Sequence, residues 1–338
     1  MLLEKIGTLQ ENSEPLRFSE IDDPLPVENE ILIRVSACGV CHTELDEIEG
    51  RTAPACLPIV LGHQVVGTIV ALGKNARRFR LGERVGVAWI FAACGLCKFC
   101  KAGNENLCTE FKATGRDVNG GYAELMTAHQ DFVYSLPEGF TDAEAAPLLC
   151  AGAIGYRSLR LSGIADGQNL GLTGFGASAH LVLKMVRHRY PRVKVFVFAR
   201  SEREREFAKE LGAVWAGDTT TASPQKLDAI IDTTPAWTPI VEALKNLEPG
   251  GRLIINAIRK EERDKDVLVG LSYPTHLWLE KEIKSVANVA RADVSGFLRL
   301  AAEMRIKPEV EEYPLNDANR ALLELKAAKI RGAKVLRM

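Results

Sequence analysis

The spacing of apolar and polar residues changes character near residue 150. Before this point, short β-branched runs are separated by Gly, Pro and Asn turn signals. These runs predict strands at residues 31–35, 65–70 and 84–89. Strands at such spacing are typical of a compact, barrel-like, mainly-β domain.

After residue 150, apolar runs that predict buried strands alternate with helical patterns. The predicted strands are 169–173, 193–199, 227–232 and 252–257. The predicted helices between them are 179–188, 202–211 and 237–247. Two further predicted helices, 297–304 and 317–328, precede a last short strand. This alternation favours a parallel sheet with helices on its faces.

Composition and charge exclude several classes of protein. Hydrophobic residues make up 46% and charged residues 26% of the 338 residues, which excludes a disordered or collagen-like chain. The net charge is −1, so no global field favours nucleic acid or an anionic membrane as a partner. No apolar run approaches the ~20 residues that span a bilayer. The N-terminus lacks a signal-peptide pattern, and we expect a cytoplasmic protein.

All eight cysteines lie between residues 38 and 150, which points to metal binding or catalysis rather than a disulfide framework. Cys94, Cys97, Cys100 and Cys108 have the spacing C-x2-C-x2-C-x7-C. Four thiolates on one short lobe suit a closed, tetrahedral, structural zinc site. Iron–sulfur ligation is the rival interpretation, but ferredoxins place the fourth cysteine after three residues and before Pro.

Three more residues are candidate ligands, although each is weak alone. They are Cys41, His63 and Cys150, and an isolated Cys is most often a small core residue. Together, segments 37–44, 61–67 and 147–152 resemble the medium-chain zinc alcohol dehydrogenase family, with the four-cysteine lobe between the second and third. The resemblance covers nearly the whole chain.

The resemblance implies that Cys41, His63 and Cys150 bind a catalytic zinc with a fourth position open to water or a substrate oxygen. It implies that Thr43 hydrogen-bonds the substrate oxygen and takes its proton, and that Glu44 orients His63. The alternative for Thr43 is an ordinary strand-end threonine.

Further roles follow from the same resemblance. His42 takes a position that contacts the cofactor diphosphate, or its imidazole simply faces solvent. Trp89 forms the aromatic wall of the substrate pocket, or it is core. Since Trp89 and Ile90 are bulky and no charged residue adjoins them in sequence, we expect an apolar pocket.

Two positions depart from the family pattern. Gln64 stands where a glutamate usually follows the ligand histidine, and Asp46 stands where many members carry the histidine that ends the proton relay. We expect Asp46 either to end the relay or to be a surface residue. Cys38 and Cys56 match no ligand position, and we expect both to be buried.

A nucleotide-binding fingerprint follows the predicted strand 169–173. Gly174, Gly176 and Ala179 form G-x-G-x-x-A before a helix, which places a pyrophosphate at the helix N-terminus. The next predicted strand ends in Ala199-Arg200-Ser201, without the acid that holds a ribose 2′-hydroxyl. Arg200 and Ser201 therefore favour NADP over NAD. Alternatively, Arg200 stacks on adenine or faces water, and Ser201 only caps a helix.

We therefore expect an α/β protein with a Rossmann doubly wound parallel sheet and a mainly-β, barrel-like catalytic domain. Residues 1–152 and 289–338 form the catalytic zinc domain with the 94–108 lobe, and residues 153–288 bind the dinucleotide. The expected function is a zinc-dependent alcohol dehydrogenase or aldehyde reductase with two zinc ions per chain, acting as a homodimer or homotetramer. The alternatives are a polyol or secondary-alcohol dehydrogenase, and a non-catalytic zinc redox sensor or binding protein.

Overall fold

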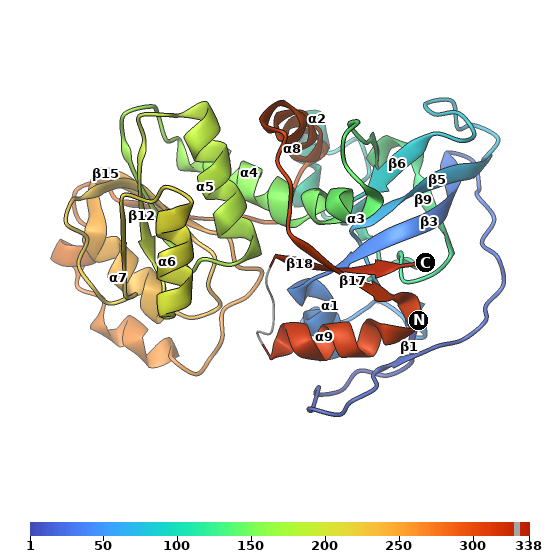
Figure 1. Cartoon of the computed structure of the whole chain (residues 1–338), viewed down its shortest axis with the longest axis horizontal. Coiled ribbons are helices and arrows are strands. Elements are labelled where there is room, and N and C mark those ends of the chain that lie inside the picture. Colours follow the sequence, from blue (N-terminus) through green and yellow to red (C-terminus); the bar gives the residue numbers. More distant parts are fainter. Residues whose placement is uncertain (328–331) are drawn as a thin grey trace. The chain divides into compact units, whose positions relative to one another are not determined.

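The N-terminal and C-terminal parts of the chain together form one folding unit, and the middle part forms a second (Figure 1). The computed structural model describes residues 1–327 and 332–338. The first unit comprises Met1–Ala153 and Val289–Met338, and the second comprises Ile154–Asn288. Helix α4 (Ala151–Ser162) contains the first crossing between them. The first unit is therefore assembled from both ends of the chain.

A seven-stranded sheet forms the frame of the first unit, in the order β10-β6-β5-β3-β18-β17 with β9 also paired to β3. Its strands are β3 (Glu30–Val40), β5 (Val65–Leu72), β6 (Arg84–Val87), β9 (Leu125–His129), β10 (Val133–Ser135), β17 (Val310–Pro314) and β18 (Ala333–Arg337). Two small sheets join β1 (Leu2–Leu3), β2 (Leu16–Arg17) and β4 (Ile59–Val60), and β7 (Ile90–Ala92) with β8 (Lys112–Ala113). The predicted strands in this half correspond to β3, β5 and β6, and the separate sheet domain is confirmed.

One apolar core joins the N-terminal and C-terminal parts of this unit. Ile31 and Ile33 on β3 pack in the same cluster as Leu336 on β18 and Leu322 on α9 (Ala318–Lys326), and all four side chains are fully buried. Full burial of such a side chain contributes ~1.5–3 kcal/mol. Helix α9 and strand β18 therefore contribute to the core of this unit.

A buried lysine joins the same elements through polar contacts. Lys334 on β18 has no exposed side-chain surface, and its Nζ donates to Glu324 at 2.7 Å, to Glu311 at 2.8 Å and to the Tyr313 hydroxyl. Because each of the three ammonium protons meets an acceptor, the charge can be buried. These bonds connect β17, β18 and α9.

Helices and 3₁₀ turns complete the first unit. They are α1 (His42–Ile48), α2 (Lys98–Lys101), α3 (Asp142–Ala145), α8 (Arg291–Met304) and α9, with 3₁₀ turns η1 (Glu105–Leu107), η2 (Gln130–Phe132), η3 (Ala146–Leu149) and η6 (Leu315–Asp317). The predicted helix 297–304 is the second half of α8. The predicted helix 317–328 corresponds to α9, and its last residue lies outside the described residues.

The second unit is a six-stranded, fully parallel sheet in the order β13-β12-β11-β14-β15-β16. Its strands are β11 (Asn169–Thr173), β12 (Lys194–Phe198), β13 (Trp215–Gly217), β14 (Leu227–Asp232), β15 (Leu247–Ile255) and β16 (Glu282–Ser285). Its helical elements are α5 (Ala177–Arg189), α6 (Glu202–Glu210), α7 (Thr238–Asn246), the 3₁₀ turn η4 (Lys265–Gly270) and the π-helical turn η5 (Tyr273–Leu277). The strand order reverses between β11 and β14. The carboxyl ends of these two strands therefore mark the topological switch point of a doubly wound sheet.

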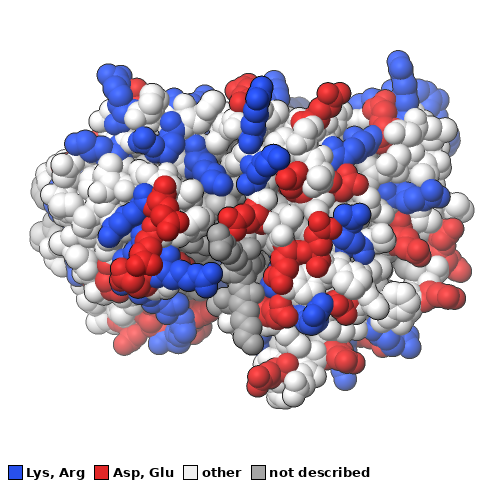
Figure 2. All heavy atoms as spheres, in the orientation of Figure 1, with Lys and Arg blue, Asp and Glu red and all other residues white. Residues whose placement is uncertain are grey.

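The sequence predicted the second unit closely at its centre and less well at its edges. β11 and β14 match their predicted bounds, whereas β15 begins five residues before the predicted 252–257 strand. The edge strands β13 and β16 were not predicted. No helix in the described ranges is both long and apolar enough to cross a bilayer. Acidic and basic side chains both occur across the face shown in Figure 2.

Candidate metal and nucleotide sites

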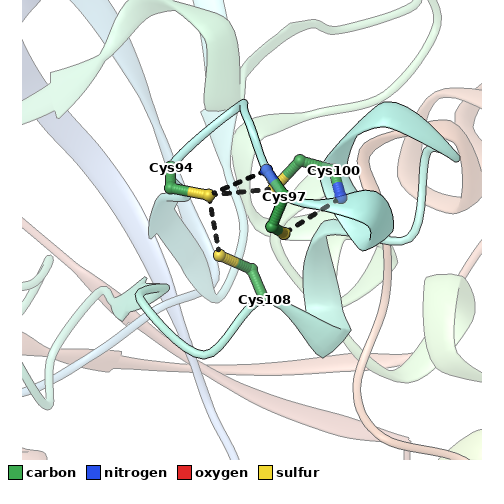
Figure 3. Close-up of side chains that lie close together, drawn as sticks. All are labelled: Cys94, Cys97, Cys100 and Cys108. Atoms are coloured by element: carbon green, nitrogen blue, oxygen red, sulfur yellow. Dashed lines mark hydrogen bonds between the residues drawn. The ribbon is translucent and has the colours of Figure 1, made fainter.

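The four cysteines of the 94–108 lobe turn their sulfurs toward one another (Figure 3). All four Sγ atoms lie within 4.8 Å of each other, with Cys94 3.5 Å from Cys108 and 3.9 Å from Cys100. The Cys97 N–H donates to the sulfur of Cys94 at 3.4 Å, and the Cys100 N–H donates to that of Cys97 at 3.4 Å. The short helix α2 begins directly after Cys97, so the first turn of the helix sets this spacing.

The electrostatics of this cluster suit a bound cation. Backbone N–H groups, first that of Cys97, lower the pKa of the Cys94 thiol to about 7. Burial raises the pKa of Cys100 to about 12. Four thiolates cannot ionise together at this distance without a positive charge between them, and a divalent metal that prefers sulfur supplies it. The donor set therefore fits a closed, tetrahedral metal site.

An ion pair between a buried carboxylate and a partly exposed arginine holds the lobe to helix α8. Glu105 in η1 is almost fully buried, and its Oε1 accepts a hydrogen bond from Nε of Arg291 at 2.8 Å. Arg291 is the first residue of α8. The lobe thus rests on an element from the C-terminal part of the chain.

The second candidate metal set joins three distant segments. The ligand atoms of Cys41, His63 and Cys150 lie within 4.8 Å of one another, and Sγ of Cys41 is 3.8 Å from Nε2 of His63. Cys41 precedes α1, His63 lies between β4 and β5, and Cys150 follows η3. Three protein ligands leave one tetrahedral position open. The three residues that the sequence grouped are therefore brought together.

Glu44 stabilises two members of this set at once. Its Oε1 lies 2.6 Å from Nδ1 of His63, and its Oε2 accepts the backbone N–H of Cys41 at 2.8 Å. Both Glu44 and His63 are fully buried. A carboxylate at Nδ1 keeps the proton on that nitrogen, which leaves Nε2 free to bind a metal.

The thiols of this set carry the same electrostatic conflict as those of the lobe. The neighbouring Cys150 thiol, followed by burial, raises the pKa of Cys41 well above its usual range. A divalent cation would remove this penalty, because the metal-bound form of cysteine is the thiolate. The donors therefore fit a zinc ion.

The position of His63 depends on the preceding glycine. Gly62 has φ +97°, and a Cβ atom there would lie 2.4 Å from Cδ1 of the buried Tyr122. The left-handed backbone and the close ring both require glycine. This contact fixes the backbone that presents the imidazole.

The remaining family positions of helix α1 differ in exposure. Thr43 is half-buried, and its N–H donates to Cys41 Sγ at 3.3 Å. His42 is exposed. Asp46 is buried, and its Oδ1 accepts a hydrogen bond from Nε of Arg51 at 2.6 Å. The relay role of Asp46 stays a prediction, and the alternative that it is a surface residue is wrong.

One expectation about the cysteines is wrong. Cys56 is exposed, because it lies in the loop between α1 and β4, whereas Cys38 on β3 is buried as predicted. No charged residue adjoins Trp89 in sequence, but the fold brings the guanidinium of Arg116 to 5.0 Å from the centre of its ring. The loop after β8 returns to Trp89 through a hydrogen bond from the Thr114 N–H at 2.8 Å, a tertiary contact that sequence spacing does not reveal.

A buried carboxyl that sequence reasoning missed lies close to the second metal set. Glu47 on α1 is fully buried, and neither of its oxygens has a hydrogen-bond partner among the described residues. Burial, followed by the charge of Glu44, raises the pKa of Glu47 well above its usual range. The Glu44–Glu47 spacing would have been a signal only if α1 had been predicted as a helix, because residues three apart share a helix face.

The glycine-rich turn of the second unit has the geometry that its motif implies. Gly174 has φ +75°, and a Cβ atom there would lie 2.9 Å from Cγ2 of Thr234. Gly176 precedes the 13-residue helix α5 and faces open space. Ala179 is fully buried, as the helix-packing position requires. Helix α5 begins directly after this turn, and a pyrophosphate at its N-terminus stays a prediction.

The end of β12 carries the residues expected at the adenosine ribose. Ala199 is buried, Arg200 is exposed, and the Ser201 hydroxyl accepts the Glu204 N–H at 3.4 Å as the cap of α6. Sequence reasoning missed Arg205, whose Nη1 donates to the carbonyl oxygens of Ala199 at 2.8 Å and Arg200 at 2.9 Å.

A carboxylate does lie near this strand end, contrary to expectation. Asp218 follows β13, the strand beside β12, and its Oδ2 is 3.7 Å from Nη1 of Arg205. The acid comes from a neighbouring strand, so the residues that follow β12 in sequence do not reveal it. Pairing with Arg205 offsets its charge.

Comparisons with known proteins identify the family of the chain. Residues 27–138 match the family described as Alcohol dehydrogenase GroES-like domain. The chain is 41% identical to the probable alcohol dehydrogenase AdhA of Mycobacterium tuberculosis over 318 residues, which cover 93% of this chain and 90% of that protein. The chain belongs to the medium-chain zinc-type alcohol dehydrogenase family. The resemblance inferred from sequence is thus confirmed.

Solved structures confirm the fold class of this family member. CAD from Helicobacter pylori complexed with NADP(H) superimposes with a TM-score of 0.81 at 25% identity, covering 93% of this chain and 92% of that chain. A thermostable alcohol dehydrogenase from Pyrobaculum aerophilum, cobalt and zinc bound, superimposes with a TM-score of 0.85 at 23% identity, covering 100% and 98%, and this likeness bears on the fold alone. The chain is an NAD(P)-linked oxidoreductase of the alcohol dehydrogenase family.

The buried carboxyl of Glu47 makes stability depend on pH. Its pKa is raised in the folded state, so the unfolded chain releases this proton at lower pH and stability falls as pH rises above about 4.5. Glu47→Gln removes this loss, and the melting temperature of the variant relative to wild type should increase between pH 5 and pH 8. Each 1 kcal/mol of added free energy of unfolding should raise the melting temperature by about 2–4 °C.

Glu49→Gln is the matched control with the opposite sign. Although burial by itself raises it, hydrogen bonds from Lys326 and Arg51 lower the pKa of Glu49 to about 2, so its ionised form stabilises the fold at neutral pH. This variant should melt below wild type at pH 8. A Glu47→Gln variant whose melting curve follows wild type at every pH would show that Glu47 is ionised or solvated in the folded protein.

Proposed function

We propose that the chain is a zinc-dependent alcohol dehydrogenase or aldehyde reductase that transfers a hydride between a small alcohol or aldehyde and NADP(H). The observation that carries the proposal is the convergence of Cys41, His63 and Cys150 with Glu44 behind the imidazole. Two sulfurs and one nitrogen leave an open position, which a purely structural site would fill with a fourth ligand. A non-catalytic zinc protein would not require that opening.

Each site residue of the first unit then has a defined role. Cys41, His63 and Cys150 would hold the zinc, which supplies Lewis-acid chemistry at the substrate oxygen when bound. Thr43 accepts the proton of the alcohol hydroxyl at Oγ1 and returns it during aldehyde reduction. Glu44 holds His63 in the tautomer that metal binding requires. Trp89 forms one wall of the substrate pocket, with Arg116 behind its ring.

The second unit binds the dinucleotide in this proposal, and residues 1–153 with 289–338 bind the substrate and both metals. The Gly174–Gly176 turn and the N-terminus of α5 support binding of the pyrophosphate. The family pattern also implies a diphosphate contact for His42. When bound, the nicotinamide would supply the hydride acceptor, so that alcohol and NADP⁺ would yield aldehyde, NADPH and a proton.

Metal content and turnover test the proposal together. Purified chain should contain two zinc ions, oxidise a primary alcohol and lose that activity with a chelator. Cys150→Ser should lose one zinc and all turnover with little change in melting temperature, because the site is open. Cys97→Ser should lose the other zinc and melt at a lower temperature, because a closed metal site contributes folding energy.

Cys56→Ser is the control for these two variants, since Cys56 is exposed and belongs to neither cluster. It should keep two zinc ions and full activity. One zinc per chain, iron in place of zinc, or undiminished turnover by Cys150→Ser would each contradict the proposal.

The cofactor preference follows from the end of β12. Arg200 can form up to two charge-assisted hydrogen bonds with a 2′-phosphate, each worth about 1.5–3 kcal/mol. Since ~1.4 kcal/mol is tenfold in affinity, kcat/KM should favour NADPH over NADH by about tenfold to a hundredfold. Ala199→Asp with Arg200→Ile should reverse the preference by introducing the ribose acid and removing the cation.

Arg203→Ile is the matched control, because Arg203 is an exposed arginine on the adjacent helix α6. It should leave the ratio of the two kcat/KM values unchanged. Equal or better use of NADH by the wild-type chain would mean that Asp218, with Arg205 beside it, dominates at the ribose.

The assembly that we propose is a homodimer or homotetramer formed through the second unit. β16 ends the parallel sheet, and no strand in the described residues pairs with its outer edge. Exposed apolar side chains lie on β16 and in the segment that precedes it in sequence: Val269, Leu271, Tyr273, Trp278, Leu279 and Ile283. An unpaired edge strand with an apolar border favours pairing with a second copy around a two-fold axis.

Ile283→Lys on β16 should shift the particle mass toward the monomer in light scattering. Lys284→Ala, on the next residue of the same strand, is the control and should keep the wild-type mass. A monomeric wild-type chain at micromolar concentration would contradict the assembly.

A further inference from the structure

A buried ion pair joins the loops at the carboxyl edge of the parallel sheet. Asp232 is the last residue of β14 and has no exposed surface. Its Oδ2 is 2.5 Å from Nζ of Lys260, which lies in the segment after β15. Lys260 is itself largely buried. Neither residue belongs to the glycine-rich motif or to the end of β12.

The second oxygen of Asp232 reaches across the switch point. Oδ1 accepts hydrogen bonds from the Thr173 hydroxyl at 2.5 Å and the Thr234 hydroxyl at 2.8 Å. Thr173 is the last residue of β11, directly before Gly174. β11 and β14 flank the reversal of strand order, where α/β sheets bind their ligands. The carboxylate therefore connects the start of the glycine-rich turn to Lys260.

Lys260 also binds the backbone of the segment that follows β14. Besides Asp232, its Nζ donates to the carbonyl oxygens of Thr234 at 2.7 Å and Ala236 at 3.1 Å. An ammonium group has three protons, and these contacts use all of them. Lys260 thus has no N–H left for a phosphate, and it can act on a ligand only by placing the loops.

The glycine-rich turn has little tolerance for movement of these loops. Gly174 approaches the 233–234 segment so closely that a Cβ atom would lie 2.9 Å from Thr234 and 3.0 Å from Thr233 Oγ1. The same segment is held by Lys260. If the ammonium is removed, Asp232 is left as an uncompensated buried charge and the segment must rearrange. Such a rearrangement displaces Gly174 directly.

We infer that the Asp232–Lys260 pair is a positioning device for the pyrophosphate of the dinucleotide, the part that NAD and NADP share. This inference rests on the proposed function, because it takes the glycine-rich turn as the cofactor site. It adds two positioning residues that contact no substrate. In this inference the Asp232–Lys260 pair affects the affinity for both dinucleotides. The preference between NAD and NADP depends on the residues at the end of β12.

The test is direct binding of NADH, NADPH and ADP-ribose to the full-length, zinc-loaded protein, by nucleotide fluorescence or calorimetry. Lys260→Met should weaken all three by a common factor of about ten or more, and KM for the cofactor should rise more than kcat falls. Lys260→Arg should recover part of the affinity. Lys245→Met is the matched control, because it removes a surface pair with Glu242 at 2.8 Å in the same unit.

Thr173→Val provides a second variant in case Lys260→Met does not fold. It removes only the hydroxyl that donates to Asp232. It should weaken NADH, NADPH and ADP-ribose equally, by a smaller factor than Lys260→Met.

Three outcomes would overturn the inference, and they differ from one another. If both variants fold and bind all three ligands like wild type, the pair has a structural role only. If NADPH alone loses affinity, the pair acts at the 2′-phosphate and not at the pyrophosphate. If the wild-type chain binds none of the three ligands, the proposed function itself fails and the inference fails with it.

Discussion

The carboxylate of Glu44 makes two hydrogen bonds on which the first unit depends. One oxygen faces Nδ1 of His63, and the other accepts the N–H of Cys41 at the start of α1. The first bond sets the orientation and tautomer of the histidine, and the second fixes the helix that presents Cys41 and Thr43. A ligand from one segment is thereby fixed relative to a ligand from another. The Glu44 side chain reaches both groups.

Both units place a buried carboxylate at the point where separate segments meet. In the first unit Glu44 joins α1 to the loop before β5, and in the second Asp232 joins β11, β14 and the segment after β15. A buried carboxylate is costly unless its lone pairs are satisfied, so each one strongly favours a single arrangement of its partners. Glu47 lacks such partners among the described residues, and its neutral form is favoured instead.

The motifs predicted from the sequence are those whose chemistry is local. The four-cysteine spacing and the G-x-G-x-x-A turn lie within short segments, and the central strands β11 and β14 are mostly apolar runs. Cys41, His63 and Cys150 could be grouped only through a resemblance to a family, since nothing local joins them.

Tertiary contacts account for what the sequence did not predict. Arg116 reaches Trp89 because the loop after β8 folds back, and Asp218 reaches the end of β12 from a neighbouring strand. The short helix α1 was missed because its cap is a cysteine in a position that Ser, Thr, Asp or Asn usually fills. The role of Lys260 was not predicted, because its partner Asp232 lies 28 residues earlier, at the end of β14.

The split construction of the first unit sets the order in which the protein can fold on the ribosome. β18 pairs with β3 so that Lys334 lies opposite Val40, the residue before Cys41. The strand that leads to Cys41 therefore lacks one neighbour until β18 has left the ribosome exit tunnel. The second unit is continuous, and its sheet can form while the C-terminal segment is still being synthesised. Such long-range pairing is slow to form, so the segment around Cys41 reaches its final packing after the second unit, late in biogenesis.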